Sequence, residues 1–211
     1  MNMSEKPSLL IIGNSNVGKS SITKKILKNP KQFKGKTGKT PGSTLLIKPI
    51  TQHGMDFQIV DLPGFGYMRK TSKRREEHIK NQVVRHIEKH HEDYFFGLVV
   101  LNILRIEDEL EKYFIKNTET IPLSFELISF LREFKIPMLV VVNKIDKVSN
   151  LDVNRIIGLL VEASRAYGLN LVHLTNFKFN YNYEIPFLEF SALKKTNLGK
   201  LKKIIYRFLN Q

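Results

Sequence analysis

Short apolar runs alternate with longer amphipathic stretches along the chain, a pattern typical of an α/β fold built on a largely parallel sheet. The apolar runs predict strands at Ser8–Ile12, Leu45–Thr51, Asp56–Val60, Phe96–Asn102, Met138–Val142 and Phe187–Phe190. Helical spacing predicts helices at Lys19–Leu27, Arg74–His90, Leu123–Phe134, Leu151–Tyr167 and Asn197–Leu209. We therefore expect a six-stranded sheet with helices on both faces.

Three stretches modify this picture. Only Gln52–Met55 separates the second and third predicted strands, which predicts a hairpin and so one antiparallel strand in a mostly parallel sheet. Ile103–Pro122 is polar and acidic, which indicates an insertion. Leu169–Pro186 is rich in Asn, Tyr and Phe and predicts a loop or an extra strand. With 211 residues and no linker-like tract, residues 1–211 are predicted to form a single domain.

Residues 13–20 match the phosphate-binding pattern G-x-x-x-x-G-K-[ST]. In such a loop the backbone N–H groups point at phosphate oxygens, Lys19 supplies charge to the β- and γ-phosphates, and Ser20 offers a hydroxyl to Mg²⁺. Nucleotide contacts are predicted at Gly13, Asn14, Ser15, Asn16, Val17, Gly18, Lys19, Ser20 and Ser21. The alternative is a plain glycine-rich turn; the apolar strand before the loop and the helix after it favour phosphate binding.

The pattern Asp-x-x-Gly at Asp61–Gly64 follows the third predicted strand. A carboxylate at this strand end can hold Mg²⁺ through water, and the Gly64 N–H can reach the γ-phosphate. Alone, the pattern would indicate a turn. Behind a phosphate-binding loop and a strand, it indicates a metal and γ-phosphate contact.

Asn143-Lys144-Ile145-Asp146 again follows an apolar strand, and its chemistry suits guanine. The Asp146 carboxylate can accept from guanine N1–H and N2–H₂, and the Lys144 stem can cover the purine face. Asn143 can either bond the opposite edge of the base or tie this segment to the phosphate loop. Ser191, Ala192 and Leu193, after the last predicted strand, are expected to bring backbone N–H groups to guanine O6.

In this order, the motifs resemble those of the Ras-like GTPase superfamily, whose three-layer P-loop NTPase fold is thereby implied. Gly13–Ser21 with Lys39–Thr44 and Asp61–Tyr67 is similar to the EngB (YihA/YsxC-type) family, and the Asn143 form is closer to its archaeal members. The resemblance implies a GTP-binding protein of large ribosomal subunit assembly, in a family also linked to division septation. It implies GTP or GDP as ligand, with Mg²⁺.

Switching and hydrolysis are expected to involve further residues. Thr44 is predicted to complete the Mg²⁺ shell beside Ser20 and the water-linked Asp61, with Thr40 and then Thr37 as alternatives, or all of them in a polar turn. Lys19, Thr44 and Gly64 form the predicted catalytic set. Phe65 stands where Ras-like proteins carry the glutamine that orients water, so intrinsic turnover is expected to be slow.

Two readings of Asn16 stay open. In related GTPases an asparagine at this position helps hold K⁺ near the phosphates, so K⁺ is a candidate cofactor that raises turnover. The alternative is an asparagine that only shapes the loop.

Composition predicts a class of partner and a cellular compartment. The chain carries 34 Lys and Arg against 20 Asp and Glu, a net charge of +14, which favours a polyanion. Basic runs occur within 24–39 and 69–75 and predict an rRNA-facing surface beside the switch segments; the alternative is a pair of solvated charge runs. With no cysteine, no bilayer-length apolar run and no signal peptide, we expect a cytoplasmic protein without membrane contact. We expect a monomer.

Two other function classes compete with a GTPase. A non-hydrolysing, GTP-gated checkpoint module is favoured by the missing glutamine and opposed by the complete phosphate and Mg²⁺ ligands. An ATP-dependent P-loop kinase or ATPase is opposed by Asn143–Asp146.

Overall fold

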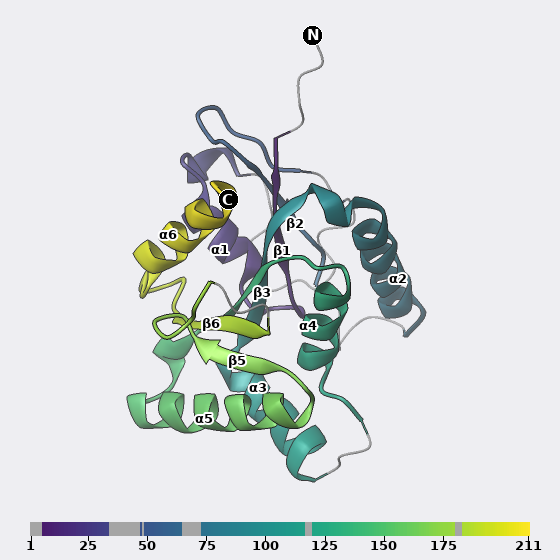
Figure 1. Cartoon of the computed structure of the whole chain (residues 1–211), viewed down its shortest axis with the longest axis vertical. Helices are drawn as coiled ribbons and strands as arrows, with labels where there is room; N and C mark the ends of the chain where they lie inside the picture. Colours follow the sequence, from purple (N-terminus) through teal and green to yellow (C-terminus); the bar gives the residue numbers. More distant parts are fainter. Residues whose placement is uncertain (1–5, 34–46, 48, 65–72, 117–119, 180–182) are drawn as a thin grey trace.

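In the part of the chain that the structure describes, one sheet has six strands in the order β2-β1-β3-β4-β6-β5 (Figure 1). The structure is a computed structural model, and it describes residues 6–33, 47, 49–64, 73–116, 120–179 and 183–211. The strands are β1 (Ser8–Ile12), β2 (Gln58–Asp61), β3 (Tyr94–Asn102), β4 (Met138–Asn143), β5 (Asn170–His173) and β6 (Glu184–Phe190). All of their pairings are parallel.

Six α-helices accompany this sheet among the described residues. They are α1 (Lys19–Ile26), α2 (Lys73–His90), α3 (Ile103–Leu110), α4 (Leu123–Glu133), α5 (Asn150–Ala166) and α6 (Leu198–Leu209). Among the described helices, none is both long enough and apolar enough to cross a bilayer.

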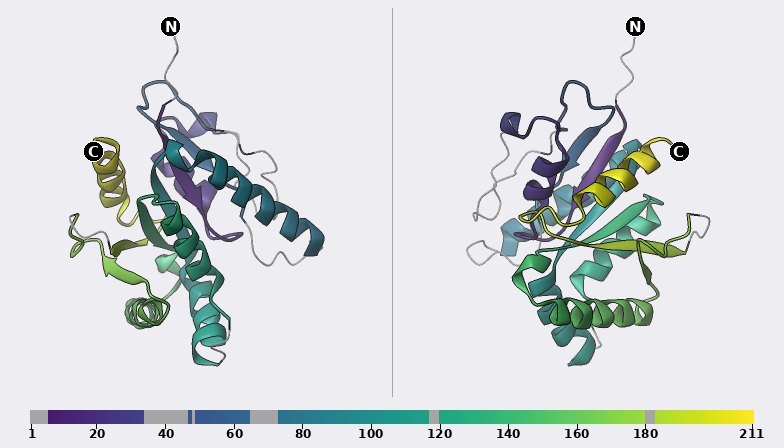
Figure 2. Two further views of the ribbon diagram at one scale, coloured as in Figure 1. Left: turned by 45° about the vertical axis from the view of Figure 1, so that its right-hand side comes forward. Right: turned by 90° about the vertical axis from the view of Figure 1, so that its left-hand side faces the viewer.

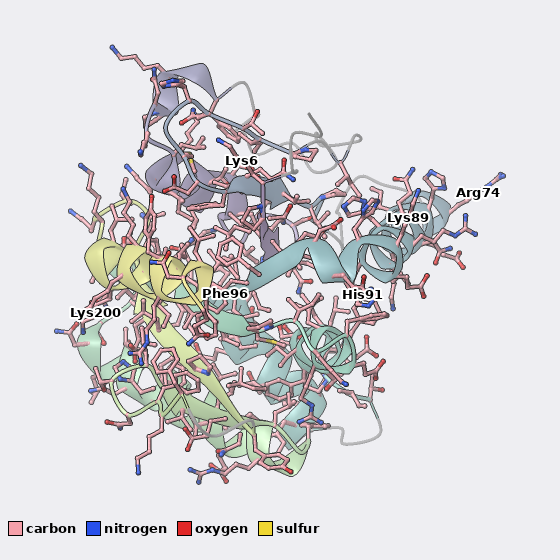
Figure 3. All side chains as sticks on the ribbon, turned by 45° about the horizontal axis from the view of Figure 1, so that its top comes forward. Lys6, Arg74, Lys89, His91, Phe96 and Lys200 are labelled. Carbon is pink, nitrogen blue, oxygen red and sulfur yellow. The ribbon has the colours of Figure 1, made fainter. Side chains whose placement is uncertain are left out.

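The central strands are buried on both faces, which explains their continuous apolar sequence. Alternate residues of β1 enter opposite cores: Leu9 and Ile11 belong to the core that α1 and α6 cover, whereas Leu10 and Ile12 belong to the core that α2 to α5 cover. Figure 2 shows the sheet between α6 on one side and α2 with α4 on the other, which gives the expected three layers. Phe96 of β3 is fully buried and stacks on Phe208 of α6. Figure 3 labels Phe96 beside α6.

The predicted antiparallel strand is not part of the sheet. Of Leu45–Thr51, residues 45, 46 and 48 lie outside the described residues, and the predicted hairpin with 56–60 is reduced to one antiparallel bridge between Ile50 and Ile59. The chain turns soon after the bridge, where Met55 N donates to Gln52 O at 3.3 Å. Beyond the bridge, the Gln52 side chain exchanges hydrogen bonds of 2.7 and 3.0 Å with the Asn29 backbone instead. The described sheet is therefore all parallel.

The polar, acidic stretch 103–122 begins as a helix. Ile103, Ile106 and Leu110 of α3 lie on one face and are buried, and a π-helical turn at Glu111–Ile115 follows. That this stretch is an insertion into a single domain stays a prediction. The stretch 169–186 supplies the extra strand, β5, which pairs with β6 at the sheet edge.

Because the strands are parallel, the carboxyl ends of β1, β2, β3, β4 and β6 meet at one edge of the sheet. The loops that carry the predicted motifs all leave the sheet from this edge.

Candidate nucleotide-binding site

The loop after β1 has a backbone that only glycine fits at its two ends. Gly13 has φ +148°, and a Cβ there would lie 2.3 Å from the Val100 carbonyl oxygen of β3. Gly18 has φ +106°, and its Cβ would lie 2.3 Å from Asn143 Nδ2. Both positions need a left-handed backbone and closer contact than any side chain allows. The strand before the loop and the helix after it hold the loop in this curled form.

Lys19, the first residue of α1, is buried inside the loop. Its Nζ donates to Gly13 O at 2.9 Å and to Asn14 O at 3.0 Å. Burial lowers the pKa of Lys19 to about 8, while the charge of Asp61 opposes this shift. The loop therefore encloses a cation that is still protonated at neutral pH, which is the arrangement an anionic ligand requires.

Asp61 at the end of β2 faces the first turn of α1. Ser20 Oγ donates to Asp61 Oδ2 at 3.1 Å, and the Thr23 hydroxyl lies 3.3 Å from the same oxygen. Burial raises the pKa of Asp61, and the charge of Lys19 and the two hydroxyls oppose that shift. Asp61 Oδ1 is buried with no hydrogen-bond partner among the described residues. A hydroxyl beside an unsatisfied carboxylate oxygen is a set that suits Mg²⁺ and its bound water.

Gly64 lies directly against the phosphate-binding loop. Ser15 Oγ donates to Gly64 O at 3.1 Å, and a Cβ at Gly64 would lie 2.7 Å from Lys19 Nζ and 2.9 Å from Ser15 N. The loop after β2 thus contacts the buried lysine itself. A change in the position of Gly64 would therefore alter its contacts with Ser15 and Lys19 of the phosphate-binding loop.

Asn143, at the end of β4, joins the other loops of the site. Its Nδ2 donates to Val17 O at 2.8 Å, and its Oδ1 accepts from Ala192 N at 3.1 Å. Of the two arrangements expected for Asn143, the structure therefore has the tie to the phosphate-binding loop. Lys144, in the left-handed region at φ +69°, donates from Nζ to Asn16 O at 2.6 Å.

Asp146 and the loop after β6 form the wall of a cavity of about 430 Å³. Asp146 Oδ1 accepts from Ser191 Oγ at 2.5 Å, and its side chain is only 8% exposed. Ser191 Oγ in turn accepts from Lys194 N at 2.9 Å. The described lining residues are Gly18, Ser21, Lys24, Lys25, Pro30, Asn143, Lys144, Asp146, Lys147, Ala192 and Leu193. A carboxylate is thus presented to a cavity that runs up to the phosphate-binding loop.

The structure brings together the predicted residues of three motifs, and it also adds two residues. Thr44, Thr40, Thr37 and Phe65 lie outside the described residues, as do several of the basic residues in 24–39 and 69–75. Thr23 was missed, although it lies four residues after Lys19 on the helix face toward Asp61. Arg105 was also missed: its guanidinium donates to Ser15 O at 2.9 Å from the start of α3. Arg105 belongs to no sequence motif, and it lies in the stretch 103–122 that was interpreted as an insertion.

A parallel sheet whose carboxyl edge carries a glycine loop with a buried lysine, a serine–aspartate pair and an Asn-Lys-x-Asp segment defines the P-loop GTPase class. A comparison with family profiles agrees: the profile described as "50S ribosome-binding GTPase" matches residues 8–144. The chain belongs to this family, and within it to the EngB-type GTP-binding proteins.

Similar curated proteins are archaeal and are named "Probable GTP-binding protein EngB". The relative from Methanococcus maripaludis is 34% identical over 69% of this chain and 60% of its own length. The relative from Pyrococcus abyssi is 29% identical over 97% of this chain and 86% of its own length. The chain thus matches less than two thirds of the length of the Methanococcus relative.

Solved structures agree on the fold. The crystal structure of a probable GTP-binding protein engB covers 96% of this chain and 98% of its own, with a TM-score of 0.72 and 28% identity. The structure of Era in complex with MgGDPNP and a segment of 16S ribosomal RNA has a TM-score of 0.55 and 20% identity, and covers 97% of this chain and 57% of its own. The likeness to Era concerns the fold alone.

Proposed function

We propose that this protein binds GTP with Mg²⁺, hydrolyses it slowly to GDP, and uses the nucleotide state to switch its contacts with the large ribosomal subunit during assembly. The observation that carries the proposal is the Asp146 carboxylate, almost fully buried, bonded to Ser191 and lining the cavity beside Gly18. A carboxylate there can accept both guanine donors, N1–H and N2–H₂, a pair that adenine lacks. The family to which the chain belongs supports the ribosomal partner.

The phosphate end of the site supports hydrolysis. Lys19 and the curled loop are placed to hold the β- and γ-phosphates, and Gly64 contacts Lys19, so the segment that begins at Gly64 can sense the γ-phosphate. Bound Mg²⁺ would neutralise charge that develops on the phosphates. The sequence has Phe65 in place of a water-orienting glutamine, so slow turnover is proposed, with K⁺ near Asn16 as one candidate for the missing stabilisation. The proposed compartment is the cytoplasm.

The direct test measures fluorescent GDP binding in Mg²⁺ with GTP and ATP as competitors, followed by single-turnover hydrolysis in K⁺ and in Na⁺. We expect GTP to compete and ATP not to compete, and GTP to be converted to GDP within one slow turnover. Equal competition by ATP would overturn the guanine assignment. Binding without any conversion would support a GTP-gated checkpoint instead, and equal rates in the two salts would remove K⁺.

Replacing Asp61 by Asn or Ser20 by Ala is expected to weaken the Mg²⁺-dependent part of GTP affinity about ten- to hundredfold. Asp61→Asn removes the carboxylate charge and Ser20→Ala removes the hydroxyl of the Ser20–Asp61 pair, and contacts to charged groups contribute about 1.5–3 kcal/mol. The measurement is GTP affinity with Mg²⁺ and with EDTA. Asp108→Asn, an exposed change on α3, is the control. Variants that keep the wild-type ratio of the two affinities would contradict this metal site.

An RNA contact is favoured by the distribution of charge. Residues 6–55 and 191–211 contain no Asp or Glu. The helices α1 and α6 within these two stretches pack on the same face of the sheet (Figure 1). Exposed lysines of this face include Lys28 and Lys31 near α1 and Lys200 and Lys203 on α6; Figure 3 shows Lys200 pointing outward. A surface with cations and without acidic residues on its helices attracts a polyanion.

Reversing two charges on α6, with Lys200→Glu and Lys203→Glu together, is expected to weaken binding to ribosomal RNA. The slope of log affinity against log salt should fall by about two, because each phosphate contact contributes about one. The measurement is RNA affinity over a salt series. The control reverses Lys112 and Lys135, two exposed lysines on the elements of the other core. If both double variants lower the slope equally, the contact is not specific to the α1–α6 face.

A further inference from the structure

Two cations hold consecutive carbonyl groups of the phosphate-binding loop. Arg105 NH1 donates to Ser15 O at 2.9 Å, and Lys144 Nζ donates to Asn16 O at 2.6 Å. They come from adjacent strands: Arg105 lies three residues after the end of β3, and Lys144 directly follows β4. Lys144 belongs to the guanine motif, whereas Arg105 belongs to no motif in the sequence.

Through the planar peptide bond, these two contacts also fix the directions of two N–H groups. In a planar trans peptide the carbonyl oxygen and the N–H of the next residue point in opposite directions. A cation on Ser15 O therefore fixes the direction of the Asn16 N–H, and a cation on Asn16 O fixes the direction of the Val17 N–H. These are N–H groups of the loop that the motif uses to bind phosphate.

Helix stability does not explain an arginine at position 105. Arg105 is in the first turn of α3, where the positive end of the helix dipole disfavours a cation, and this turn has no acidic residue. Its side chain is exposed, so it fills no gap in the core. It also adds positive charge beside Lys144: burial lowers the pKa of Lys144 most and Arg105 next, while the charge of Asp146 opposes this shift. A second cation at this place therefore costs free energy that a bound anion would offset further.

The base of α3 is held firmly enough for Arg105 to position the loop. Asn102 caps the helix by accepting from Leu104 N at 3.2 Å, and Ile103 and Ile106 are buried on either side of Arg105. Further along, Glu107 accepts from Arg155 of α5 at 2.5 Å. The guanidinium is therefore presented from a fixed helix end.

We propose that Arg105 is a positioning residue for nucleotide phosphate binding. Together with Lys144 it holds the Ser15 and Asn16 carbonyls, so that the N–H groups of the next residues are oriented to donate to the phosphates. This inference rests on the proposed function, because it assumes that a nucleotide phosphate is the ligand of the loop. It makes the start of α3 a part of the nucleotide site.

The test measures release of fluorescent GDP from Arg105→Ala, with the melting temperature of the ligand-free protein recorded alongside. We expect release to be about tenfold faster, the scale of a charge-assisted hydrogen bond, with the melting temperature unchanged. Arg105→Lys, which keeps a cationic donor, should recover part of the loss. Arg132→Ala is the matched control: Arg132 NH1 also donates to a backbone carbonyl, Gly168 O at 3.0 Å, but away from the site.

The outcomes separate this inference from the proposed function. If the wild-type protein binds no guanine nucleotide, the proposed function fails. If the wild type binds GDP but Arg105→Ala releases it at the wild-type rate, or no faster than Arg132→Ala does, the role of Arg105 is overturned. If Arg105→Ala also has a lower melting temperature, Arg105→Gln is the second variant, because it keeps the stem of the side chain without the charge. Faster GDP release from Arg105→Gln supports the role, and unchanged release overturns it.

Discussion

Replacing Asp146 by Asn is expected to change the accepted base from guanine to xanthine. The carboxylate can accept from both N1–H and N2–H₂ of guanine, whereas an amide offers one acceptor and one donor. Xanthine carries a carbonyl in place of the amino group, so it matches the amide. Loss of a buried, base-specific contact of this kind costs on the order of 10³- to 10⁴-fold in affinity. The Asp146 side chain is only 8% exposed, which keeps water from replacing the lost contact.

The measurement is competition of fluorescent GDP by xanthosine and guanosine diphosphates. The fold should persist, because the amide oxygen of the new residue can still accept from Ser191 Oγ as Asp146 Oδ1 does. Asp152→Asn, in the first turn of α5 with a side chain that is 45% exposed, is the control and should leave the base preference unchanged. A variant that still prefers guanine would show that Asp146 only supports Ser191 and does not read the base.

Replacing Gly18 by Ala is expected to abolish nucleotide binding and to destabilise the fold. The new Cβ would lie 2.3 Å from Asn143 Nδ2 at a backbone φ of +106°. Asn143 would have to move, and its bonds to Val17 O and Ala192 N would be lost together. Backbone strain and an unsatisfied buried amide cost about 1–3 kcal/mol each. We expect GDP affinity to fall more than about a hundredfold.

Thermal unfolding and GDP titration measure the two effects separately. Gly158→Ala is the matched control, because Gly158 lies within α5 and a Cβ there would meet nothing within 4 Å. That change should leave binding intact and stabilise the protein by up to about 1 kcal/mol through helix propensity. A Gly18→Ala protein that binds GDP like the wild type would mean that the loop and Asn143 can separate without consequence.

Sequence patterns predicted the central strands well because these strands are buried on both faces. The apolar run of β1 ends at Ile12, where the chain must turn at Gly13, and the structure has the same bounds. β3 begins two residues earlier than predicted, at Tyr94, because β1 offers a pairing partner there. Periodicity could not reveal that partner. The antiparallel strand was wrong for a related reason: apolar composition does not show which residues find a pairing partner, and among the described residues of that run only Ile50 forms a bridge, with Ile59.

The helix α3 was not predicted because its apolar face is narrow. Ile103, Ile106 and Leu110 carry the buried face, and the residues between them are mostly charged. The high average polarity of this stretch therefore hid the helical spacing of its apolar residues. Since Arg105 belongs to this helix, missing the helix also hid its contact with Ser15.

In the candidate site, the sequence predicted which motif residues lie close together better than it predicted their side-chain contacts. The Ser20–Asp61 pair follows from the motifs, because each motif stands at the end of a neighbouring parallel strand. The Ser191 hydroxyl bond to Asp146 does not follow from them, since only backbone N–H groups were expected to act in that loop. Thr44 and Phe65 stay predictions, because they lie outside the described residues.

The two bonds of Asn143 also bear on how the chain folds. They join residues 126 and 49 positions apart, so three strands that enter the sheet from distant parts of the chain must all be in place before the bonds can form. Contacts between residues this far apart are late and slow to form, because much of the chain must be ordered first. A partly folded molecule that lacks β6 would lack the Ala192 N–H bonded to Asn143 and the Ser191 hydroxyl bonded to Asp146. We therefore expect the site to bind its ligand only after β6 has docked on β4.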